Sequence, residues 1–334
     1  MKDIKYIMGI KNLTKFLKKY APDSIQENSI EKYSGQILGV DTSIFLYKYK
    51  YHKRFLESFV TQIIHFRKFD IELIYIFDGK PPEEKNDTLD NRKKIILNNK
   101  KKIDEEKIKL ENCAEADKKN VIQNIEKLEK RDIKVTKNDI VNLKKLFDIL
   151  GVKYIQADCE ADILCCNLYK KGFIQGCISN DMDFLASGCG ILIRDYNFKD
   201  TILEYNLSKI LECIEFTQEE FVDLCILFGC DYSNTISRVG LETAYKLMKE
   251  QKSIENILEK YVPHKYKVDH SFFKYEMCRI LLNADIEINE LMTALIKSEK
   301  KIWFQIEDSK IDFICSNSGF NRISFKKKWN VLEK

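Results

Sequence analysis

Two pairs of acidic residues constrain the fold of this chain more than any other sequence feature. Glu160 pairs with Asp162 and Asp181 pairs with Asp183, and an apolar run at residues 176–179 lies between the pairs. That run is typical of a short buried strand. Residues i and i+2 point to the same side of an extended backbone but diverge on a helix. The members of each pair can therefore converge only at the end of a strand or in a loop.

Two further apolar runs end in an aspartate and extend the same pattern. The run at residues 36–40 is followed by Asp41, and the run at residues 73–77 is followed by Asp78. Parallel strands would bring these acids to the carboxyl edge of one sheet, where open α/β sheets bind their ligands. A single long helix capped by Ser43 would join the two strands into a βαβ unit.

The remaining segments complete an α/β architecture. Strands are expected at residues 152–155, 190–194 and 202–205, and the chain beyond them has helical patterning. We therefore predict a central, mostly parallel sheet flanked by helices, followed by an α-helical C-terminal region.

The composition excludes several classes of protein. The chain has 334 residues, of which 44% are hydrophobic and 32% charged, so it can bury a large core. No apolar run approaches the roughly 20 residues of a membrane-spanning helix, and the N-terminus has no signal-peptide core, so we expect an intracellular protein that does not bind membranes. The 11 cysteines include no Cys-x-x-Cys pair, and the 4 histidines lack zinc-ligand spacing. A net charge of +4 is modest, so any affinity for nucleic acid depends on how the charge is distributed.

A charged insertion follows Asp78. From Glu83 to about Lys137 the chain is mostly Lys, Glu, Asp, Asn and Ile, and Pro81 and Pro82 mark its start. Such a segment can be a solvated helical hairpin or a mobile insertion. Because its apolar residues keep roughly helical spacing, we expect two exposed helices rather than disorder.

Seven acids are expected at the carboxyl edge of the sheet: Asp41, Asp78, Glu160, Asp162, Asp181, Asp183 and Asp231. Each one alone is equally well explained as a helix cap or a turn former. Together, clustered carboxylates repel one another unless cations compensate, and oxygen donors without His or Cys suit Mg²⁺ or Mn²⁺. Two such ions can stabilise the attacking and leaving oxygens in phosphodiester cleavage. With the lysine-rich insertion as a complement for a polyanion, the pattern predicts a metal-dependent nuclease or phosphatase.

The order of the motifs resembles the XPG-type structure-specific 5′ nucleases, and most closely the flap endonucleases. The motifs are MGIKNL at residues 8–13, VDTS at 40–43, YIFDGKPP at 75–82, EAD at 160–162, DMD at 181–183 and FGCDY at 228–232. Residues 126–137 are similar to the segment that leads out of the helical arch of flap endonucleases. The ordered series is specific, whereas each motif alone is not.

The resemblance implies a PIN-like 5′ nuclease fold and a division of the chain. A single nuclease domain would span residues 8–334, after an extension at residues 1–7. Its parts would be an N-terminal nuclease region at 8–110, a helical arch insertion at 83–137, an internal nuclease region at 148–232 and a helical C-terminal region with a helix-two-turn-helix at 233–334.

The resemblance also implies the catalytic groups. The seven acids would hold two Mg²⁺ ions, for which Mn²⁺ can substitute, and Lys85 and Arg92 at the base of the arch would steer the scissile phosphate. The reaction would be hydrolysis near a junction of single strand and duplex, leaving a 5′-phosphate. The implied roles are flap endonuclease and 5′-3′ exonuclease in DNA replication, repair or recombination.

Further residues are implied as contacts to branched or flapped DNA. Tyr47 would stack on a base, and Lys93 and Lys94 would contact the single strand in the arch. The turn with Arg238 and Gly240 falls where the family places its helix-two-turn-helix, which holds a monovalent ion such as K⁺ and the phosphates of the uncleaved duplex.

Four features depart from the family pattern. Residues 1–7 precede the usual Met-Gly start, Asp162 replaces a glutamate, and Arg238 stands at the first glycine of a Gly-x-Gly turn. The sequence also has no Gln-x-x-Leu-x-x-aromatic-aromatic motif, so we expect no sliding-clamp tether of the usual kind. We also expect a monomer.

Alternative functions remain open at this point. A relative that cuts four-way junctions or RNA shares the same acids, and a non-catalytic scaffold for branched nucleic acid would share the basic contacts. Because none of the seven acids is missing, an enzyme is favoured. The Lys-, Asn- and Ile-rich usage is typical of an AT-rich genome, such as that of a protist or a large DNA virus. We expect a nuclear location in a eukaryotic cell, and the nucleus or a cytoplasmic replication site for a virus.

Overall fold

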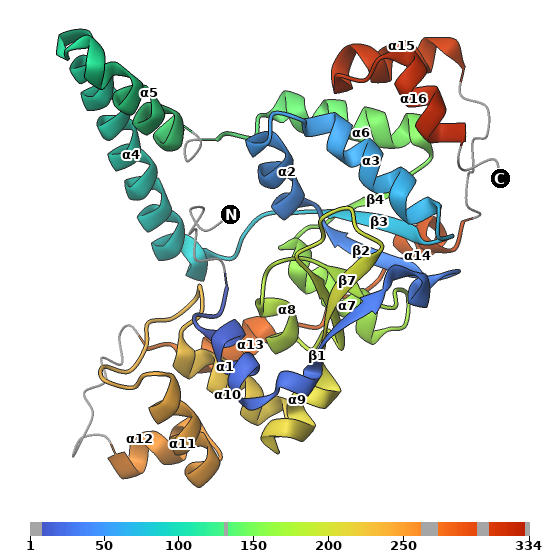
Figure 1. Ribbon diagram of the computed structural model, residues 1–334. Helices are drawn as coiled ribbons and strands as arrows, with labels where there is room; N and C mark the ends of the chain where they lie inside the picture. Colours follow the sequence, from blue (N-terminus) through green and yellow to red (C-terminus); the bar gives the residue numbers. More distant parts are fainter. Residues whose placement is uncertain (1–8, 130–132, 262–272, 299–306, 331–334) are drawn as a thin grey trace.

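A seven-stranded sheet with helices on both faces forms the centre of the molecule (Figure 1). The structure, a computed structural model, describes residues 9–129, 133–261, 273–298 and 307–330. Its strands are β1 (Ile25–Ser29), β2 (Ile37–Asp41), β3 (Glu72–Phe77), β4 (Lys153–Gln156), β5 (Cys177–Ile178), β6 (Ile191–Arg194) and β7 (Thr201–Asn206). Their order is β1-β7-β6-β5-β2-β3-β4. Strands β6, β5, β2, β3 and β4 run parallel to one another, and β7 pairs antiparallel with β6 and β1. The predicted α/β class is confirmed.

The strands bury both faces, which explains their continuous apolar runs. In β3, Ile74 and Ile76 point into one hydrophobic core, while Leu73, Tyr75 and Phe77 point into the core on the opposite face. Parallel sheets are normally covered on both faces in this way.

Two layers of helices provide this cover. One layer consists of α2 (Thr42–Tyr51), α3 (Phe55–Arg67), α6 (Lys137–Leu150), α15 (Asp308–Ser318) and α16 (Arg322–Trp329). The other consists of α1 (Leu13–Tyr20), α7 (Ala161–Lys170), α8 (Asp183–Ala186), α9 (Leu207–Ile214) and α10 (Gln218–Phe228). Beyond them, α11 (Leu241–Gln251) and α13 (Tyr275–Leu282) contact α10, α12 (Ile254–Tyr261) contacts α11, and α14 (Glu290–Lys297) contacts β4. None of the helices in the described ranges has the length and apolar character of a membrane span.

The prediction of a single long helix after Ser43 is wrong. The chain forms α2 and α3 instead, because Lys53 between them has a left-handed backbone with φ of 56°. The cap of α2 is Asp41, whose side chain accepts a hydrogen bond from the backbone N–H of Ser43 at 3.1 Å. The first acid of the series therefore also begins the helix that follows it.

The charged insertion is a helical hairpin, as predicted. After a short 3₁₀ turn at Glu83–Lys85, α4 (Asn86–Asn112) and α5 (Glu115–Glu129) pack against each other and project away from the sheet (Figure 1). Ile103 and Ile125 are buried, and the Asn99 side chain donates to the carbonyl of Leu128 at 2.9 Å. A few apolar contacts therefore hold an otherwise solvated element.

Candidate active site

The carboxyl ends of adjacent parallel strands position the first of the candidate acids. Asp41 is the last residue of β2, and Asp78 directly follows β3. Strand β2 lies between β3 and β5, and β5 leads into the loop that carries Asp181. The three strand ends therefore meet at one edge of the sheet, as the sequence predicts.

Helix ends supply the other acids. Glu160 is the N-cap residue of α7, Asp162 lies in the first turn of that helix, and Asp183 is the first residue of α8. Asp231 follows α10, and its carbonyl accepts a hydrogen bond from Thr88 of α4 at 2.6 Å. Helix N-termini favour negative charge, so the positions of Glu160, Asp162 and Asp183 partly stabilise their carboxylates.

Lys85 lies among the acids, where its predicted catalytic role requires it. Its Nζ is 2.5 Å from Glu160 Oε1 and 3.5 Å from Asp231 Oδ2, and all three side chains are nearly buried. Burial disfavours the charged ammonium, but the carboxylates of Glu160 and Asp231 outweigh it and raise the pKa of Lys85 above its ordinary value. Lys85 therefore remains a cation inside the acidic cluster.

Hydroxyl groups orient three of the carboxylates. Ser179 Oγ donates to Asp41 Oδ2 at 2.9 Å, and Tyr232 OH donates to Glu160 Oε2 at 2.9 Å. Ser43 Oγ donates to Asp78 Oδ2. These partners were not predicted as site residues, although their motifs were identified. Ser179 stands two residues before Asp181 in an extended segment, so the i, i+2 spacing was the signal that could have found it.

The acids are short of compensating charge. Burial, followed by the charge of Asp78, raises the pKa of Asp41 to about 8. Burial is also the largest cause that raises the pKa of Asp162, Asp181 and Asp183, and neighbouring carboxylates raise it further. The Oδ1 atom of Asp183 is buried without a hydrogen-bond partner. A buried oxygen of this kind needs a cation to compensate its charge.

The donor chemistry of this edge fits divalent cations. All seven side chains offer carboxylate oxygens, which Mg²⁺ and Mn²⁺ prefer. Within the described residues, no three Asp, Glu, His or Cys side chains already surround a common point that could hold an ion. Like charges keep unneutralised carboxylates apart, so such a point would form as ions draw the oxygens together.

Gly9 brings the beginning of the described chain against the acids. Its φ is 75°, and a Cβ atom at this position would lie 2.0 Å from Asp181 Oδ1 and 2.6 Å from Asp183 Oδ1. The backbone N–H of Lys11 donates to the carbonyl of Gly229 at 3.0 Å and fixes this approach. A side chain would therefore collide with the site, which explains the glycine of the MGIKNL motif.

The other predicted contacts lie on α2 and α4. Tyr47 projects from α2 with 54% of its surface exposed. On α4, Lys93 and Lys94 are exposed, and Lys93 forms an ion pair with Asp90 at 2.8 Å. The side chain of Arg92 lies outside the described part of the structure, so its role stays a prediction.

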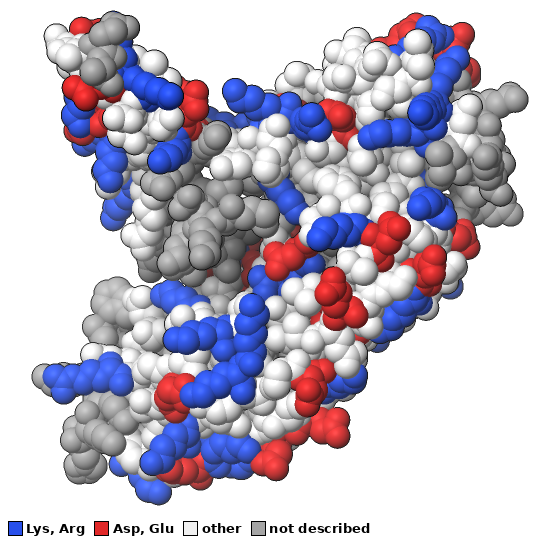
Figure 2. Space-filling model, in the orientation of Figure 1, with Lys and Arg blue, Asp and Glu red and all other residues white. Residues whose placement is uncertain are grey.

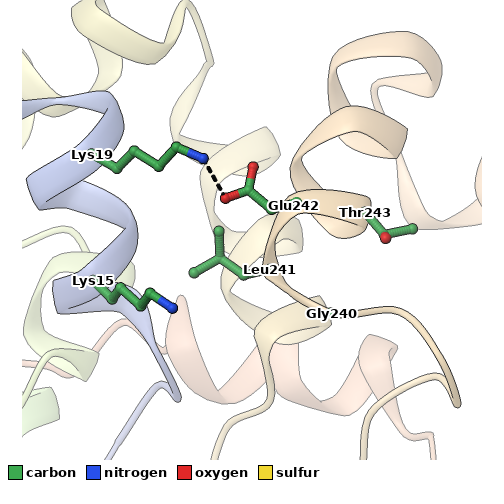
Figure 3. Close-up of a pocket in the computed structure, with 6 residues that line it drawn as sticks. All are labelled: Lys15, Lys19, Gly240, Leu241, Glu242 and Thr243. Atoms are coloured by element: carbon green, nitrogen blue, oxygen red, sulfur yellow. Dashed lines mark hydrogen bonds and ion pairs between the residues drawn. The ribbon is translucent and has the colours of Figure 1, made fainter.

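A basic region surrounds the turn that carries Arg238 and Gly240. Arg238 is exposed and has a φ of 65°, which agrees with a glycine at this position in the family. Gly240 caps α11, and beside it is a pocket of about 210 Å³ lined by Lys15, Lys19, Gly240, Leu241, Glu242 and Thr243 (Figure 3). Lys19 pairs with Glu242 at 2.6 Å. Lys and Arg side chains gather over this part of the molecule around α1 (Figure 2).

Comparisons with known proteins agree with this arrangement. Residues 8–99 match the XPG N-terminal domain, and residues 151–231 match the XPG I-region. The chain is 36% identical to flap endonuclease 1 of Entamoeba histolytica over 94% of its own length and 84% of the relative, and 32% identical to flap endonuclease 1 of Danio rerio over 94% and 83%.

Solved structures share the fold at lower identity. A flap endonuclease-1 from Methanococcus jannaschii superposes with a TM-score of 0.63 at 22% identity, covering 93% of this chain and 96% of that one. The catalytic core of Rad2 in complex with DNA substrate superposes with a TM-score of 0.66 at 17% identity, covering 97% and 100%. Human GEN1 in complex with Holliday junction DNA superposes with a TM-score of 0.62 at 18% identity, covering 97% of this chain and 77% of that one.

Proposed function

The chain belongs to the XPG family of structure-specific 5′ nucleases, and we propose that within this family it is a flap endonuclease with 5′-3′ exonuclease activity. It is therefore a hydrolase that acts on phosphodiester bonds. The observation that carries the proposal is the carboxyl edge of the sheet, where Lys85 pairs with Glu160 and Asp231 and the buried Asp183 Oδ1 has no hydrogen-bond partner. A scaffold that only bound DNA would have no use for such a costly arrangement.

The chain's own residues provide the setting for hydrolysis. The seven acids would hold two Mg²⁺ or Mn²⁺ ions, which when bound supply Lewis-acid stabilisation of the attacking and leaving oxygens. Lys85 is placed to attract the scissile phosphate, because its ammonium is fixed at the same edge. Gly9 leaves the space beside Asp181 and Asp183 that any side chain at this position would fill.

The surrounding elements account for specificity towards branched DNA. The hairpin of α4 and α5 projects beside the site and would act as the arch around the 5′ single strand, with Arg92, Lys93 and Lys94 as contacts. Tyr47 would stack on a base near the junction. The basic region around α1 and the turn at Arg238 would hold the phosphates of the uncleaved duplex, with K⁺ as the monovalent ion.

The proposal extends to where the protein acts. We place it as a monomer at sites of DNA replication, repair or recombination, in the nucleus of a eukaryotic cell or at the replication site of a virus. Flap endonuclease 1 of Entamoeba histolytica and of Danio rerio are the relatives that support this assignment.

A matched substrate panel tests the proposed function. Purified protein with Mg²⁺ is given end-labelled flap, nicked, blunt-duplex, four-way-junction and RNA substrates. We expect the highest kcat/KM on the 5′ flap, with cleavage close to the junction. Higher kcat/KM on the four-way junction or on RNA would instead identify a junction-cutting or RNA-cutting relative, and binding without cleavage of any substrate would identify a scaffold.

A second variant in the same panel tests the arch. Residues 86–129 are replaced by a short flexible linker, which removes the described hairpin and leaves the sheet intact. The melting transition should stay near that of the full chain, because α4 and α5 pack mainly against each other. Flap cleavage should fall sharply, and normal flap cleavage by the deletion variant would show that the hairpin is not an arch.

A further inference from the structure

Ser179 connects two of the acids from a fully enclosed position. Ser179 is 1% exposed, and it follows directly after β5 in the chain. Its hydroxyl donates to Asp41 Oδ2 at 2.9 Å and accepts from the backbone N–H of Asp181 at 3.0 Å. One small group thus joins the end of β2 to the loop after β5.

The hydroxyl of Ser179 is itself held in place. The backbone N–H of Ser179 donates to the carbonyl of Ile193 in β6 at 3.1 Å, so the sheet fixes the position of Ser179. Asp41 Oδ1 accepts from the backbone N–H of Ser43 at 3.1 Å, so both oxygens of the Asp41 carboxylate have a donor. Asp41 cannot rotate without losing one of these bonds.

The hydrogen bonds continue beyond Asp181. Asp181 Oδ1 accepts from the backbone N–H of Asp183 at 3.0 Å. A continuous path therefore runs from Asp41 through Ser179 and Asp181 to Asp183. The path ties the Asp41 carboxylate to the backbone of Asp181, and the Asp181 carboxylate to the backbone of Asp183, so it fixes the relative positions of these segments.

We propose that Ser179 is a positioning residue that sets the spacing of Asp41 and Asp181 for divalent-ion binding. This inference rests on the proposed function, since it takes both acids to be metal ligands. Groups that orient metal ligands act on metal affinity through the ligand and do not contact the metal. The hydroxyls of Ser43 and Tyr232 each contact one acid, whereas the hydroxyl of Ser179 contacts two acids that lie at the ends of different strands.

Three substitutions at Ser179 and one control separate positioning from packing. Ser179→Ala removes the hydroxyl, Ser179→Cys keeps most of the volume but is a weak donor, and Ser179→Thr keeps the hydroxyl. The control is Ser24→Ala. Ser24 is also fully buried, and its hydroxyl donates to the carbonyl of Ala21 at 2.6 Å, away from the acids. Both alanine variants therefore remove a buried serine hydroxyl, which makes two hydrogen bonds at Ser179 and one at Ser24.

Metal binding and cleavage are measured separately. Isothermal titration of Mn²⁺ and the Mg²⁺-induced rise in Tm report binding, and the Mg²⁺ concentration at half-maximal cleavage reports use of the metal. For Ser179→Ala we expect about tenfold weaker metal binding and a matching rise in that concentration, as found for other groups that orient metal ligands. Affinity for flap DNA in EDTA should be unchanged. Ser179→Thr should restore metal binding, while Ser24→Ala should lower Tm with an unchanged metal response.

The outcomes distinguish the inference from the proposed function. If Ser179→Ala lowers Tm like Ser24→Ala but keeps normal metal binding, Ser179 only packs the fold and the inference is wrong, although the nuclease stands. If Ser179→Ala does not fold, Ser179→Cys decides, and normal metal binding by that variant overturns the inference. If wild-type protein neither binds Mn²⁺ nor cleaves any substrate, the proposed function itself fails.

Discussion

The two edges of the parallel sheet both bury charge, but only one edge compensates it fully. At the amino edge, Lys153 of β4 places Nζ 2.8 Å from Glu72 of β3, 2.8 Å from the carbonyl of Ile296 and 2.7 Å from the carbonyl of Ser298. Three acceptors therefore match the three protons of the ammonium. At the carboxyl edge, Asp183 Oδ1 has no hydrogen-bond partner.

This difference links the amino edge to the stability of the fold and the carboxyl edge to function. The hydrogen bonds of Lys153 to the carbonyls of Ile296 and Ser298 fix the end of α14 to the sheet, so Lys153 contributes to the fold. The carboxyl edge instead keeps carboxylates whose pKa values are raised by burial and by one another. Groups kept in such an unfavourable state typically mark a functional site. Removing a charge should therefore weaken the fold at the amino edge and weaken activity at the carboxyl edge.

The largest expected effect is the loss of cleavage in Asp181→Ala. Removal of one metal ligand should lower the single-turnover rate by on the order of 1,000-fold or more, equivalent to about 4 kcal/mol of barrier. Flap binding in EDTA should persist, because it depends on distributed basic contacts. The metal-free Tm should not fall, since a buried like charge is removed.

Asp158→Ala provides the matched control for this loss. Asp158 is exposed in the loop before Glu160, and it is not one of the seven acids. The same change of charge there should leave cleavage nearly normal. A turnover of Asp181→Ala within roughly tenfold of wild type would remove Asp181 from the metal site, since that is only about 1.4 kcal/mol.

The next effect is a loss of stability in Lys153→Met. Breaking a buried ion pair leaves Glu72 and two carbonyls without a partner, so we expect a loss of about 3 kcal/mol in the free energy of unfolding, measured with urea. Folded protein should cut flaps at the normal rate, because the pair lies at the opposite edge. Adding Glu72→Leu should recover much of the loss. A stability equal to wild type would show that the two edges do not differ as proposed.

Local sequence patterns could predict the sheet and the acids, because their positions depend on local rules. Apolar runs identified β2, β3 and β5, and the acid that follows each run within two residues identified the active edge. Strand β1 was missed, since Ile25–Ser29 is mostly polar and becomes a strand only by pairing with β7. The break between α2 and α3 depends on a left-handed residue, Lys53, which no glycine marks.

The hydrogen-bond partners of the acids could not be predicted in the same way. Tyr232 and Glu160 are 72 residues apart, and Ser179 and Asp41 are 138 apart, so only the folded chain brings each pair together. The identity of Lys85 as a cation within the cluster came from the family resemblance, and its contacts to Glu160 and Asp231 came from the structure. The sequence pattern thus located the carboxyl edge, and the tertiary structure gave the hydrogen bonds and ion pairs among its residues.

For Lys85→Gln we expect a smaller effect, in which the stability of the metal-free protein falls while the stabilisation by Mg²⁺ increases. Without metal, Glu160 and Asp231 lose their cationic partner, so the metal-free protein should be less stable by about 2 kcal/mol. The Mg²⁺-induced rise in Tm should become larger, because ions no longer compete with the ammonium for these carboxylates. The cleavage rate should nevertheless fall. A Mg²⁺ response equal to that of wild type would show that Lys85 does not occupy the metal-binding carboxylates.

The last expected effect is a pH dependence of metal stabilisation at the carboxyl edge. Asp41 has a pKa raised to about 8 in the fold, against about 3.9 in an unfolded chain. Protonation of Asp41 therefore stabilises the metal-free fold. This contribution is complete below the pKa of Asp41 in the unfolded chain, and it is lost as pH rises towards 8. Metal binding requires the ionised carboxylate, so between pH 6 and pH 8 apparent Mg²⁺ affinity should rise by roughly tenfold per pH unit for each proton displaced. The rise in Tm produced by a fixed Mg²⁺ concentration should accordingly be larger at pH 8 than at pH 6. Asp41→Asn should flatten this difference, whereas Lys153→Met should keep it while lowering Tm at both pH values. An equal rise in Tm at both pH values in wild type would mean that metal ions do not displace protons from these acids, and the contrast between the two edges would then lose its electrostatic basis.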